Sequence, residues 1–141
     1  MYFDTGYIAK FYLNEPDSQR IREVVWKADV IYSSLWAFAE FHSILHRHIR
    51  ESGASARGAR ELAVRFSKHI NDGLWHLIPV NEALLRRTSA LMLAGPRELF
   101  IRTADAVHLT TAHELGEQTV WTNDRHMLAA ASYFGLRGQS V

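Results

Sequence analysis

The sequence contains no cysteine. This absence excludes disulfide bonds, thiolate catalysis and zinc sites built on cysteine, and it agrees with a reducing compartment. No segment approaches the roughly 18 uncharged apolar residues that a membrane-spanning helix needs. The stretch from Met1 to Asp4 also lacks the basic region that precedes the apolar part of a signal peptide. We therefore expect a cytoplasmic protein that does not enter a membrane.

The sequence also lacks a surplus of charge of one sign. Its 16 lysines and arginines and 15 aspartates and glutamates leave a net charge of +1, which by itself does not argue for nucleic-acid binding. Only Lys10, Lys27 and Lys68 are lysines, so arginine, the better bidentate partner of phosphates and carboxylates, carries most of the positive charge. The 141 residues have an ordinary globular composition without repeats or linkers, which predicts a single domain over residues 1–141.

Short apolar runs alternate with helical patterns along the chain. The expected strands lie at 2–3, 30–32, 74–80 and 119–122, with an edge strand from residue 136 onward. The expected helices span 7–13, 17–27, 35–51, 56–71, 81–93, 103–115 and 125–134, the second of them capped by Asp17 or Ser18. Such alternation is typical of parallel βαβ units. It predicts an α/β fold with a small, mainly parallel sheet, in which ligands bind beyond the carboxyl ends of the strands.

Two acidic residues stand at the ends of expected strands. Asp4 follows the first strand, Asp124 follows the strand that contains Trp121, and each also precedes a helix. Aspartate is a preferred N-cap residue, so helix capping explains each acid taken alone. The two roles are compatible, because one carboxylate can accept a backbone N–H and still face a ligand.

Two further acids, Glu40 and Asp105, lie within expected helices on faces that are otherwise apolar. Burying a carboxylate without a partner costs several kcal/mol, so such groups are usually paired, protonated or metal-bound. A purely structural explanation would pair Asp105 with Arg102, three residues earlier, and Glu40 with Arg47 or another basic residue.

A functional explanation brings all four carboxylates to one end of the sheet. Their mutual repulsion would raise their pKa values, and a divalent cation would remove that repulsion. With oxygen ligands and no cysteine, the suitable ions are Mg²⁺ or Mn²⁺, which support phosphodiester hydrolysis. The neighbouring polar side chains of Thr5, Thr122 and Asn123 could orient ligands or water.

The order and spacing of four motifs resemble the PIN-domain ribonucleases, and most closely the VapC-type toxins of bacterial toxin–antitoxin pairs. The motifs are Tyr2-Phe3-Asp4-Thr5-Gly6, Ala39-Glu40, Thr103-Ala104-Asp105-Ala106-Val107-His108-Leu109 and Trp121-Thr122-Asn123-Asp124, so the resemblance covers essentially the whole chain. One departure is Gly6, where many relatives carry serine or asparagine.

The resemblance implies a three-layer α/β/α fold around a central parallel sheet, and Mg²⁺- or Mn²⁺-dependent endoribonuclease activity that leaves 5′-phosphate and 3′-hydroxyl ends. By motif match, the metal-binding and catalytic acids are Asp4, Glu40, Asp105 and Asp124. Glu40 would complete the metal shell or orient the attacking water. The resemblance also implies a homodimer, an RNA substrate and a cognate antitoxin, which often brings an arginine into the acidic pocket.

Two other functions are alternatives. A non-catalytic PIN-like module would bind RNA or protein without metal chemistry, although the presence of all four acids argues against it. A phospho-acceptor receiver domain also carries acids and Mg²⁺ at strand ends. It would need adjacent acids after the first strand and a late lysine, whereas this sequence has only Asp4 and Asn123-Asp124 at those places.

Histidines and arginines outside these motifs have simpler explanations. His42 and His46 have the helical spacing of a zinc-binding pair, with His48 nearby, but Ser43 stands where a metalloprotease has glutamate. We expect them to be surface or packing residues, and we expect His108 to be a buried core residue. A group of arginines around the loop 52–55 forms either a solvated helical hairpin or a contact surface for RNA or antitoxin: Arg47, Arg50, Arg57, Arg60 and Arg65, with Arg102 as a further candidate contact.

Overall fold

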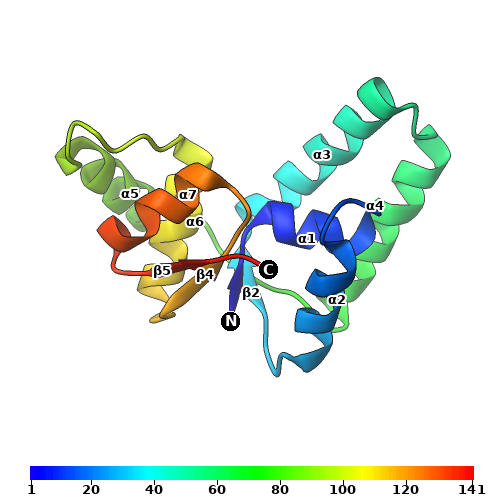
Figure 1. Ribbon diagram of the computed structural model, residues 1–141, viewed down its shortest axis with the longest axis horizontal. Helices are drawn as coiled ribbons and strands as arrows, with labels where there is room; N and C mark the ends of the chain where they lie inside the picture. Colours follow the sequence, from blue (N-terminus) through cyan, green and yellow to red (C-terminus); the bar gives the residue numbers. More distant parts are fainter.

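The computed structural model describes residues 1–141 and contains one five-stranded sheet (Figure 1). Its strands are β1 (Tyr2–Phe3), β2 (Tyr32–Ser34), β3 (His76–Ile78), β4 (Thr119–Trp121) and β5 (Arg137–Gln139). They are arranged in the order β3-β2-β1-β4-β5, and all four neighbouring pairs are parallel. The prediction of a small parallel sheet is therefore confirmed.

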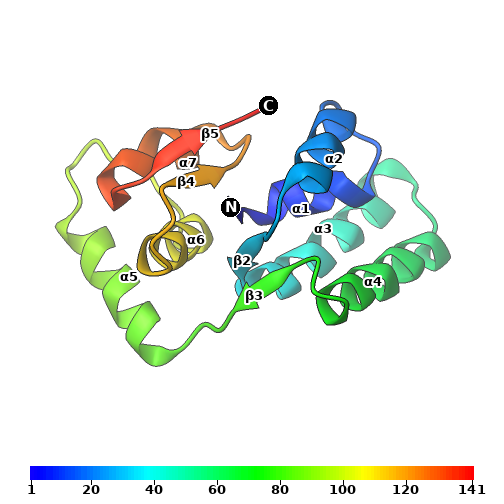
Figure 2. The same ribbon diagram turned by 90° about the horizontal axis from the view of Figure 1, so that it is seen from below.

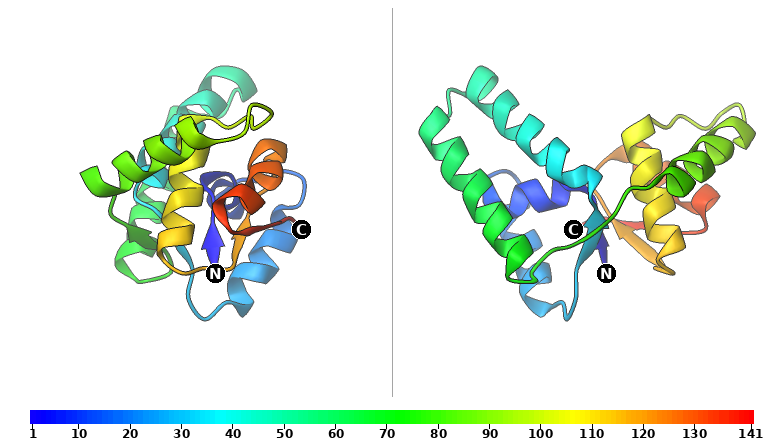
Figure 3. Two further views of the ribbon diagram at one scale, coloured as in Figure 1. Left: turned by 90° about the vertical axis from the view of Figure 1, so that its left-hand side faces the viewer. Right: turned by 180° about the vertical axis from the view of Figure 1, so that it is seen from behind.

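The helices lie in two layers, one on each side of the sheet (Figure 2). One layer holds α1 (Thr5–Tyr12), α2 (Ser18–Lys27), α3 (Trp36–Ser52) and α4 (Ala56–Asn71). The other holds α5 (Glu82–Ala94), α6 (Thr103–Glu114), α7 (Arg125–Ala130) and a 3₁₀ helix (Ala131–Phe134). This is the expected three-layer α/β/α architecture, with α3 and α4 forming a hairpin that projects outward (Figure 3). No helix has both the length and the apolar character needed to cross a bilayer.

The alternation of side chains along β1 divides the core into two parts. Tyr2 packs with Val120 and Leu109 in the layer of α6, whereas Phe3 packs with Tyr7 and Trp75 in the layer of α1. Successive side chains of a strand point to opposite faces. Because both faces of β1 are covered by helices, the strand is apolar on both sides and shows no polar alternation.

Strand β2 lies two residues later than the expected strand at 30–32. Ser33 and Ser34 directly follow the expected strand, and both are buried within β2. The Ser33 hydroxyl donates to the Phe3 carbonyl oxygen at 2.8 Å, which satisfies its polar group inside the sheet. A small hydroxyl with a backbone partner is therefore tolerated inside the sheet, beyond the residues that the sequence pattern assigned to the strand.

Strand β3 is shorter than the expected strand at 74–80. At its start, the Leu74 N–H still closes the turn after α4 by donating to the His69 carbonyl oxygen at 2.9 Å. At its end, Pro79 has no N–H to donate to a neighbouring strand. Only the three residues between these constraints pair with β2.

Two expected helix ends also differ. Asp17 occupies the N-cap position of α2 with a left-handed backbone (φ 69°), and its side chain accepts no backbone N–H. The Ser18 hydroxyl instead accepts the Glu15 N–H at 3.0 Å, so the predicted capping role is wrong for both residues. The expected helix at 125–134 begins as α7 and finishes as a 3₁₀ turn that ends at Gly135.

The strand order reverses between β1 and β4. The chain passes from β1 to its neighbour β2 and on to β3, and then crosses to β4 on the other side of β1. In open α/β sheets, ligands bind in the crevice beyond the carboxyl ends of the strands at such a reversal. Asp4 directly follows β1 and Asp124 lies three residues after β4, so the fold brings both acids to this crevice.

Candidate active site

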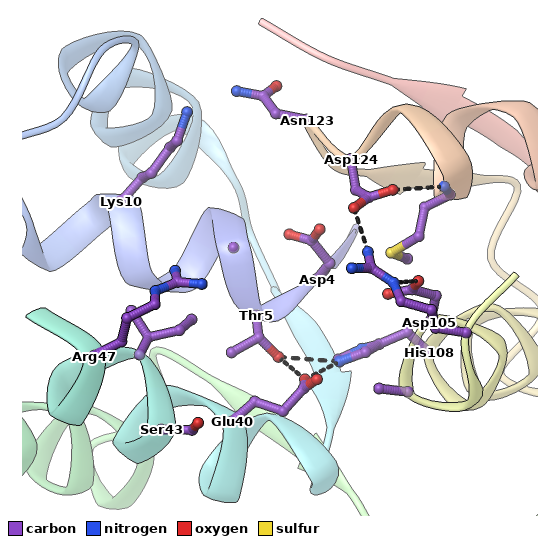
Figure 4. A pocket seen from close by; sticks show the side chains of 15 residues that line it. Asp4, Thr5, Lys10, Glu40, Ser43, Arg47, Asp105, His108, Asn123 and Asp124 are labelled. Carbon is purple, nitrogen blue, oxygen red and sulfur yellow. Dashed lines mark hydrogen bonds and ion pairs between the residues drawn. The ribbon is translucent and has the colours of Figure 1, made fainter. Parts of the chain in front are cut away.

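A polar cleft of about 490 Å³ opens at the carboxyl ends of β1 and β4 (Figure 4). Four acidic residues from four separate segments line it: Asp4 after β1, Glu40 of α3, Asp105 of α6 and Asp124 after β4. The structure thus places in one cleft all four acids that the sequence motifs indicated.

Asp4 lies on the floor of the cleft and is only 6% exposed. One carboxylate oxygen, Oδ1, accepts the Tyr7 N–H at 2.7 Å and so caps α1. The other, Oδ2, accepts a hydrogen bond from the Thr122 hydroxyl at 2.5 Å. Burial raises the pKa of Asp4 above its usual value, although these two hydrogen bonds oppose the shift. The backbone therefore holds this carboxylate in place, but no basic side chain contacts it.

Asp124 caps α7 with one oxygen and faces the cleft with the other. Its Oδ1 accepts the backbone N–H groups of His126 at 2.7 Å and Met127 at 3.1 Å. Its Oδ2 accepts a hydrogen bond from Arg102 at 2.5 Å. Burial acts to raise the pKa of Asp124, but the two backbone N–H groups and the Arg102 guanidinium outweigh it, so the pKa lies below its usual value. Asp124 therefore caps a helix and also lines the cleft, as Asp4 does.

Asp105 lies in the first turn of α6, next to Arg102 at the N-cap position. The Arg102 Nε donates to Asp105 Oδ2 at 2.8 Å while its Nη2 donates to Asp124, so one guanidinium bridges two of the four acids. This hydrogen bond and the two negative charges raise the pKa of Arg102. The structural pairing considered for Asp105 is therefore present, and Arg102 also pairs with a second carboxylate, Asp124, which lies 22 residues after Arg102.

Glu40 faces the cleft from α3, at the edge of the buried stripe of that helix. The Thr5 hydroxyl and His108 Nε2, the latter at 2.9 Å, both donate to its Oε2. Burial acts to raise the pKa of Glu40, but the hydrogen bonds and charge from His108 and Thr5 outweigh it, so the pKa lies below its usual value. Of the partners considered for Glu40, the structure shows another basic residue in place of Arg47, because α6 brings the His108 side chain to the carboxylate.

His108 is a core residue and a site residue at the same time. It is 2% exposed, which confirms the expected burial, yet its ring edge borders the cleft. The imidazole Nε2 is shared between Glu40 and the Thr5 hydroxyl, which lies 3.0 Å away. Its Nδ1 lies 2.9 Å from the Tyr2 hydroxyl. The Tyr2 hydroxyl at Nδ1 and the Glu40 carboxylate at Nε2 therefore hold the ring from both ends.

The remaining candidates are three polar side chains and the arginines. Thr5 and Asn123 line the cleft, and the buried Thr122 hydroxyl lies beneath it, donating to Asp4 and accepting the Asp124 N–H at 2.9 Å. Among the arginines, Arg47 and Arg102 line the cleft. Exposed arginines of the α3–α4 hairpin that do not line it are Arg50, Arg57, Arg60 and Arg65.

Lys10 also lines the cleft and was not anticipated. The signal lay in helical spacing, because Gly6 and Lys10 are four residues apart on α1 and share one face, which the structure turns toward the acids. Without a side chain at Gly6, this side of Asp4 stays open. A Cβ there would lie 3.4 Å from Asp4 Oδ1, which is a van der Waals contact.

The donor set suits a hard divalent cation, since carboxylates and hydroxyls are the ligands that Mg²⁺ and Mn²⁺ prefer. Asp4 is buried without a contacting positive charge, which is a further reason for a cation to bind beside it. No three acidic or histidine side chains are arranged to hold a metal ion in the described conformation. The Arg102 guanidinium lies between Asp105 and Asp124, where a cation shared by these carboxylates would bind.

Two of the three histidines of α3 have hydrogen-bonding partners outside the cleft. The His42 Nδ1 donates to the Phe38 carbonyl oxygen at 2.7 Å within α3. His48 Nε2 lies 3.0 Å from a carboxylate oxygen of Glu15. His46 is exposed on the same helix.

Comparison with known proteins agrees with this description. The family model for the PIN domain matches residues 1–132. Ribonuclease VapC46 from Mycobacterium tuberculosis is 32% identical over 138 residues, which cover 96% of this chain and 93% of the relative.

Solved structures give the same fold at low sequence identity. VapC20 of Mycobacterium tuberculosis, described as a sarcin-ricin loop cleaving toxin, has a TM-score of 0.73 at 17% identity, with 96% of this chain and 98% of that chain covered. FitAcB from Neisseria gonorrhoeae has a TM-score of 0.71 at 17% identity, with 97% and 94% covered. A FitAB structure bound to a DNA fragment has a TM-score of 0.70 at 18% identity, with 99% and 93% covered.

Proposed function

The chain belongs to the PIN domain family, and we propose that it is a metal-dependent endoribonuclease that acts as the toxin of a toxin–antitoxin pair. The observation that carries this proposal is the cleft, where carboxylates from four separate segments meet at the strand-order reversal. The VapC46 relative, named a ribonuclease, and the VapC20 toxin support RNA as the substrate class. The expected reaction is hydrolysis of an RNA phosphodiester bond.

The reaction adds water across the P–O3′ bond. The water oxygen attacks phosphorus, the bond to O3′ breaks, and a proton goes to O3′, which leaves a 5′-phosphate and a 3′-hydroxyl. A bound Mg²⁺ or Mn²⁺ supplies a Lewis acid for the phosphate and lowers the pKa of water. Asp4, Asp105 and Asp124 would hold this ion directly or through water. Glu40, fixed by Thr5 and His108, completes the shell or orients the attacking water.

Basic side chains around the cleft can hold the RNA backbone. Lys10 and Arg47 line the cleft opposite Asp105 and Asp124, so they are placed to contact phosphates that flank the scissile bond. On the hairpin, Arg57 pairs with Glu61 and Arg50 with Glu51, while Arg60 is exposed. Charge reversal at Arg57 and Arg60 should raise the KM for RNA if they contact substrate. An unchanged KM with loss of antitoxin binding would assign them to the partner instead.

The toxin role requires a second protein and a cellular site. We infer a cognate antitoxin that covers the acidic cleft, a homodimer, and a cytoplasmic location where RNA substrates are present. Purification of the chain together with any small protein encoded beside it, followed by sizing with light scattering, tests the antitoxin and the dimer together.

The nuclease proposal is tested with total cellular RNA and mapping of new 5′ ends by sequencing. The three arms are wild-type protein with Mn²⁺ or Mg²⁺, the same protein with EDTA, and Asp105→Asn with metal. New 5′-phosphate ends should form only in the first arm. If antitoxin-free wild-type protein forms none but still binds RNA, the chain is a non-catalytic binding module.

The role of Glu40 has its own test. Glu40→Gln keeps the size of the side chain and one hydrogen-bond acceptor but removes the negative charge. We expect the cleavage rate at saturating metal to fall at least about tenfold, because the variant keeps the side-chain shape but lacks the charge that orients water. An unchanged rate would exclude this role for Glu40.

A further inference from the structure

Arg102 occupies the middle of the acidic centre although its own side chain is largely in solvent. Its side chain is 57% exposed, whereas those of its partners Asp105 and Asp124 are 13% and 29% exposed. It lies at the N-cap position of α6, outside both buried clusters. The guanidinium can therefore leave the carboxylates by side-chain rotation, without moving a helix or opening the core.

Asp124 and Asp4 would keep their places after such a movement, whereas Asp105 has only Arg102 as a hydrogen-bonding partner of its carboxylate. Asp124 Oδ1 is fixed by two backbone N–H groups, and Asp4 is fixed by Tyr7 and Thr122. Arg102 holds only Asp124 Oδ2 and Asp105 Oδ2, the oxygens that face the cleft. The atoms that Arg102 covers are thus the ones that a divalent cation would require.

We propose that Arg102 is an exchangeable internal counter-ion, which neutralises Asp105 and Asp124 in the metal-free protein and competes with the divalent cation for the same two oxygens. The inference rests on the proposed metal-dependent function. According to this inference, Arg102 as well as the acidic residues of the cleft sets the affinity for the metal ion. Planarity is central, because one guanidinium reaches two carboxylates through separate N–H groups, which a single ammonium group does less well.

Metal binding without RNA tests the proposal. Full-length wild-type protein and variants are stripped with chelator, dialysed and titrated with Mn²⁺, and free Mn²⁺ is followed by electron paramagnetic resonance. The variants are Arg102→Gln, Arg102→Lys and the control Arg86→Gln. Arg86 is an exposed arginine paired with Glu82 on α5, so its loss removes the same charge away from the cleft.

We expect Arg102→Gln to bind Mn²⁺ roughly 3- to 20-fold more tightly than wild type, because two exposed charge-assisted contacts no longer compete. Arg102→Lys should fall between the two, and Arg86→Gln should match wild type. The rise in Tm on adding Mn²⁺ should likewise be largest for Arg102→Gln.

Three results would overturn the proposal. Equal or weaker Mn²⁺ binding by Arg102→Gln would show that no competition occurs, and nuclease assays could still support the proposed function. Tighter binding by Arg102→Gln with wild-type affinity in Arg102→Lys would assign the effect to net charge instead of the bridge. No Mn²⁺ binding by any variant would remove both this proposal and the metal dependence of the proposed function.

Discussion

Two tyrosine–histidine pairs lie on opposite faces of the sheet, in contrasting surroundings. On one face, the Tyr2 hydroxyl lies 2.9 Å from Nδ1 of His108. On the other, the Tyr12 hydroxyl accepts the Trp75 indole N–H at 2.7 Å and donates to Nδ1 of His69 at 2.8 Å. The Nε2 of His108 is hydrogen-bonded to the Glu40 carboxylate, whereas the His69 ring packs among aromatic side chains.

The difference lies in what each pair holds in place. His108 positions the Glu40 carboxylate at the cleft. Burial raises the pKa of the neighbouring Asp4, so the negative charge of Asp4 is unfavourable for folding. His69 and Tyr12 border the cluster of Phe11, Phe41, Phe66 and Trp75, where close aromatic packing favours folding. We infer that the first pair serves activity and the second serves stability, and substitutions can separate the two.

The sharpest separation comes from the matched pair His108→Gln and His69→Gln. We expect His108→Gln to lower kcat/KM for RNA about 10- to 100-fold, because groups that orient metal-binding carboxylates typically contribute this much. His69→Gln should leave kcat/KM within about twofold, since mutations away from the reacting groups act mainly on stability. Steady-state cleavage at saturating Mn²⁺ measures both, with circular dichroism to confirm folding. Equal losses of kcat/KM in the two variants would contradict the assignment of one pair to activity and the other to stability.

A packing change in the aromatic cluster should lower stability and leave the cleavage rate unchanged. Phe66 is fully buried, with its ring centroid 4.3 Å from that of Phe41. Phe66→Leu should lower the free energy of unfolding by about 1–2 kcal/mol. The cleavage rate per folded molecule should not change. Urea unfolding measures the loss, and Val64→Ala, at a 70% exposed position on the same helix, is the control with little expected effect. A large fall in the cleavage rate of folded Phe66→Leu would contradict the separation.

The smallest expected effect concerns pH. Burial lowers the pKa of His69 below its ordinary value of 6.5, so the unfolded chain takes up this proton at a higher pH than the folded protein does. The contribution of neutral His69 to stability is therefore complete above about pH 6.5 and decreases as the pH falls toward the folded-state pKa. His69→Gln should show a shallower loss of stability between pH 7 and 5 in urea unfolding. An identical slope would mean that another group titrates.

The fold was largely predictable because local patterns and packing agree. Helix α4 matches the expected range 56–71, since Ser55 caps it by accepting the Gly58 N–H at 3.0 Å and its apolar residues recur at helical spacing. Where local and tertiary preferences differ, prediction failed. Ser33 and Ser34 have the composition of a helix start but lie within β2, because the neighbouring strand supplies a carbonyl partner for the Ser33 hydroxyl.

The candidate site was predictable in composition but not in its internal contacts. Asp4 and Asp124 could be expected together, because parallel strands that are neighbours end at the same edge. The contact between Glu40 and His108 joins residues 68 positions apart, and Arg102 reaches Asp124 across 22 positions. Such pairings depend on the angle at which α3 and α6 approach the sheet. Spacing along the chain does not encode that angle.

The most direct test of the proposal that the acidic cleft is catalytic is single-turnover RNA cleavage by Asp4→Asn, measured with its Tm. Asparagine retains the cap on α1 and removes a buried charge, so the Tm should stay the same or rise. Cleavage at saturating Mn²⁺ should fall roughly 100-fold or more. The control Asp72→Asn alters an exposed acid that pairs with Lys68 beyond the cleft, and it should cleave at the wild-type rate. Wild-type cleavage by a folded Asp4→Asn variant would contradict the account.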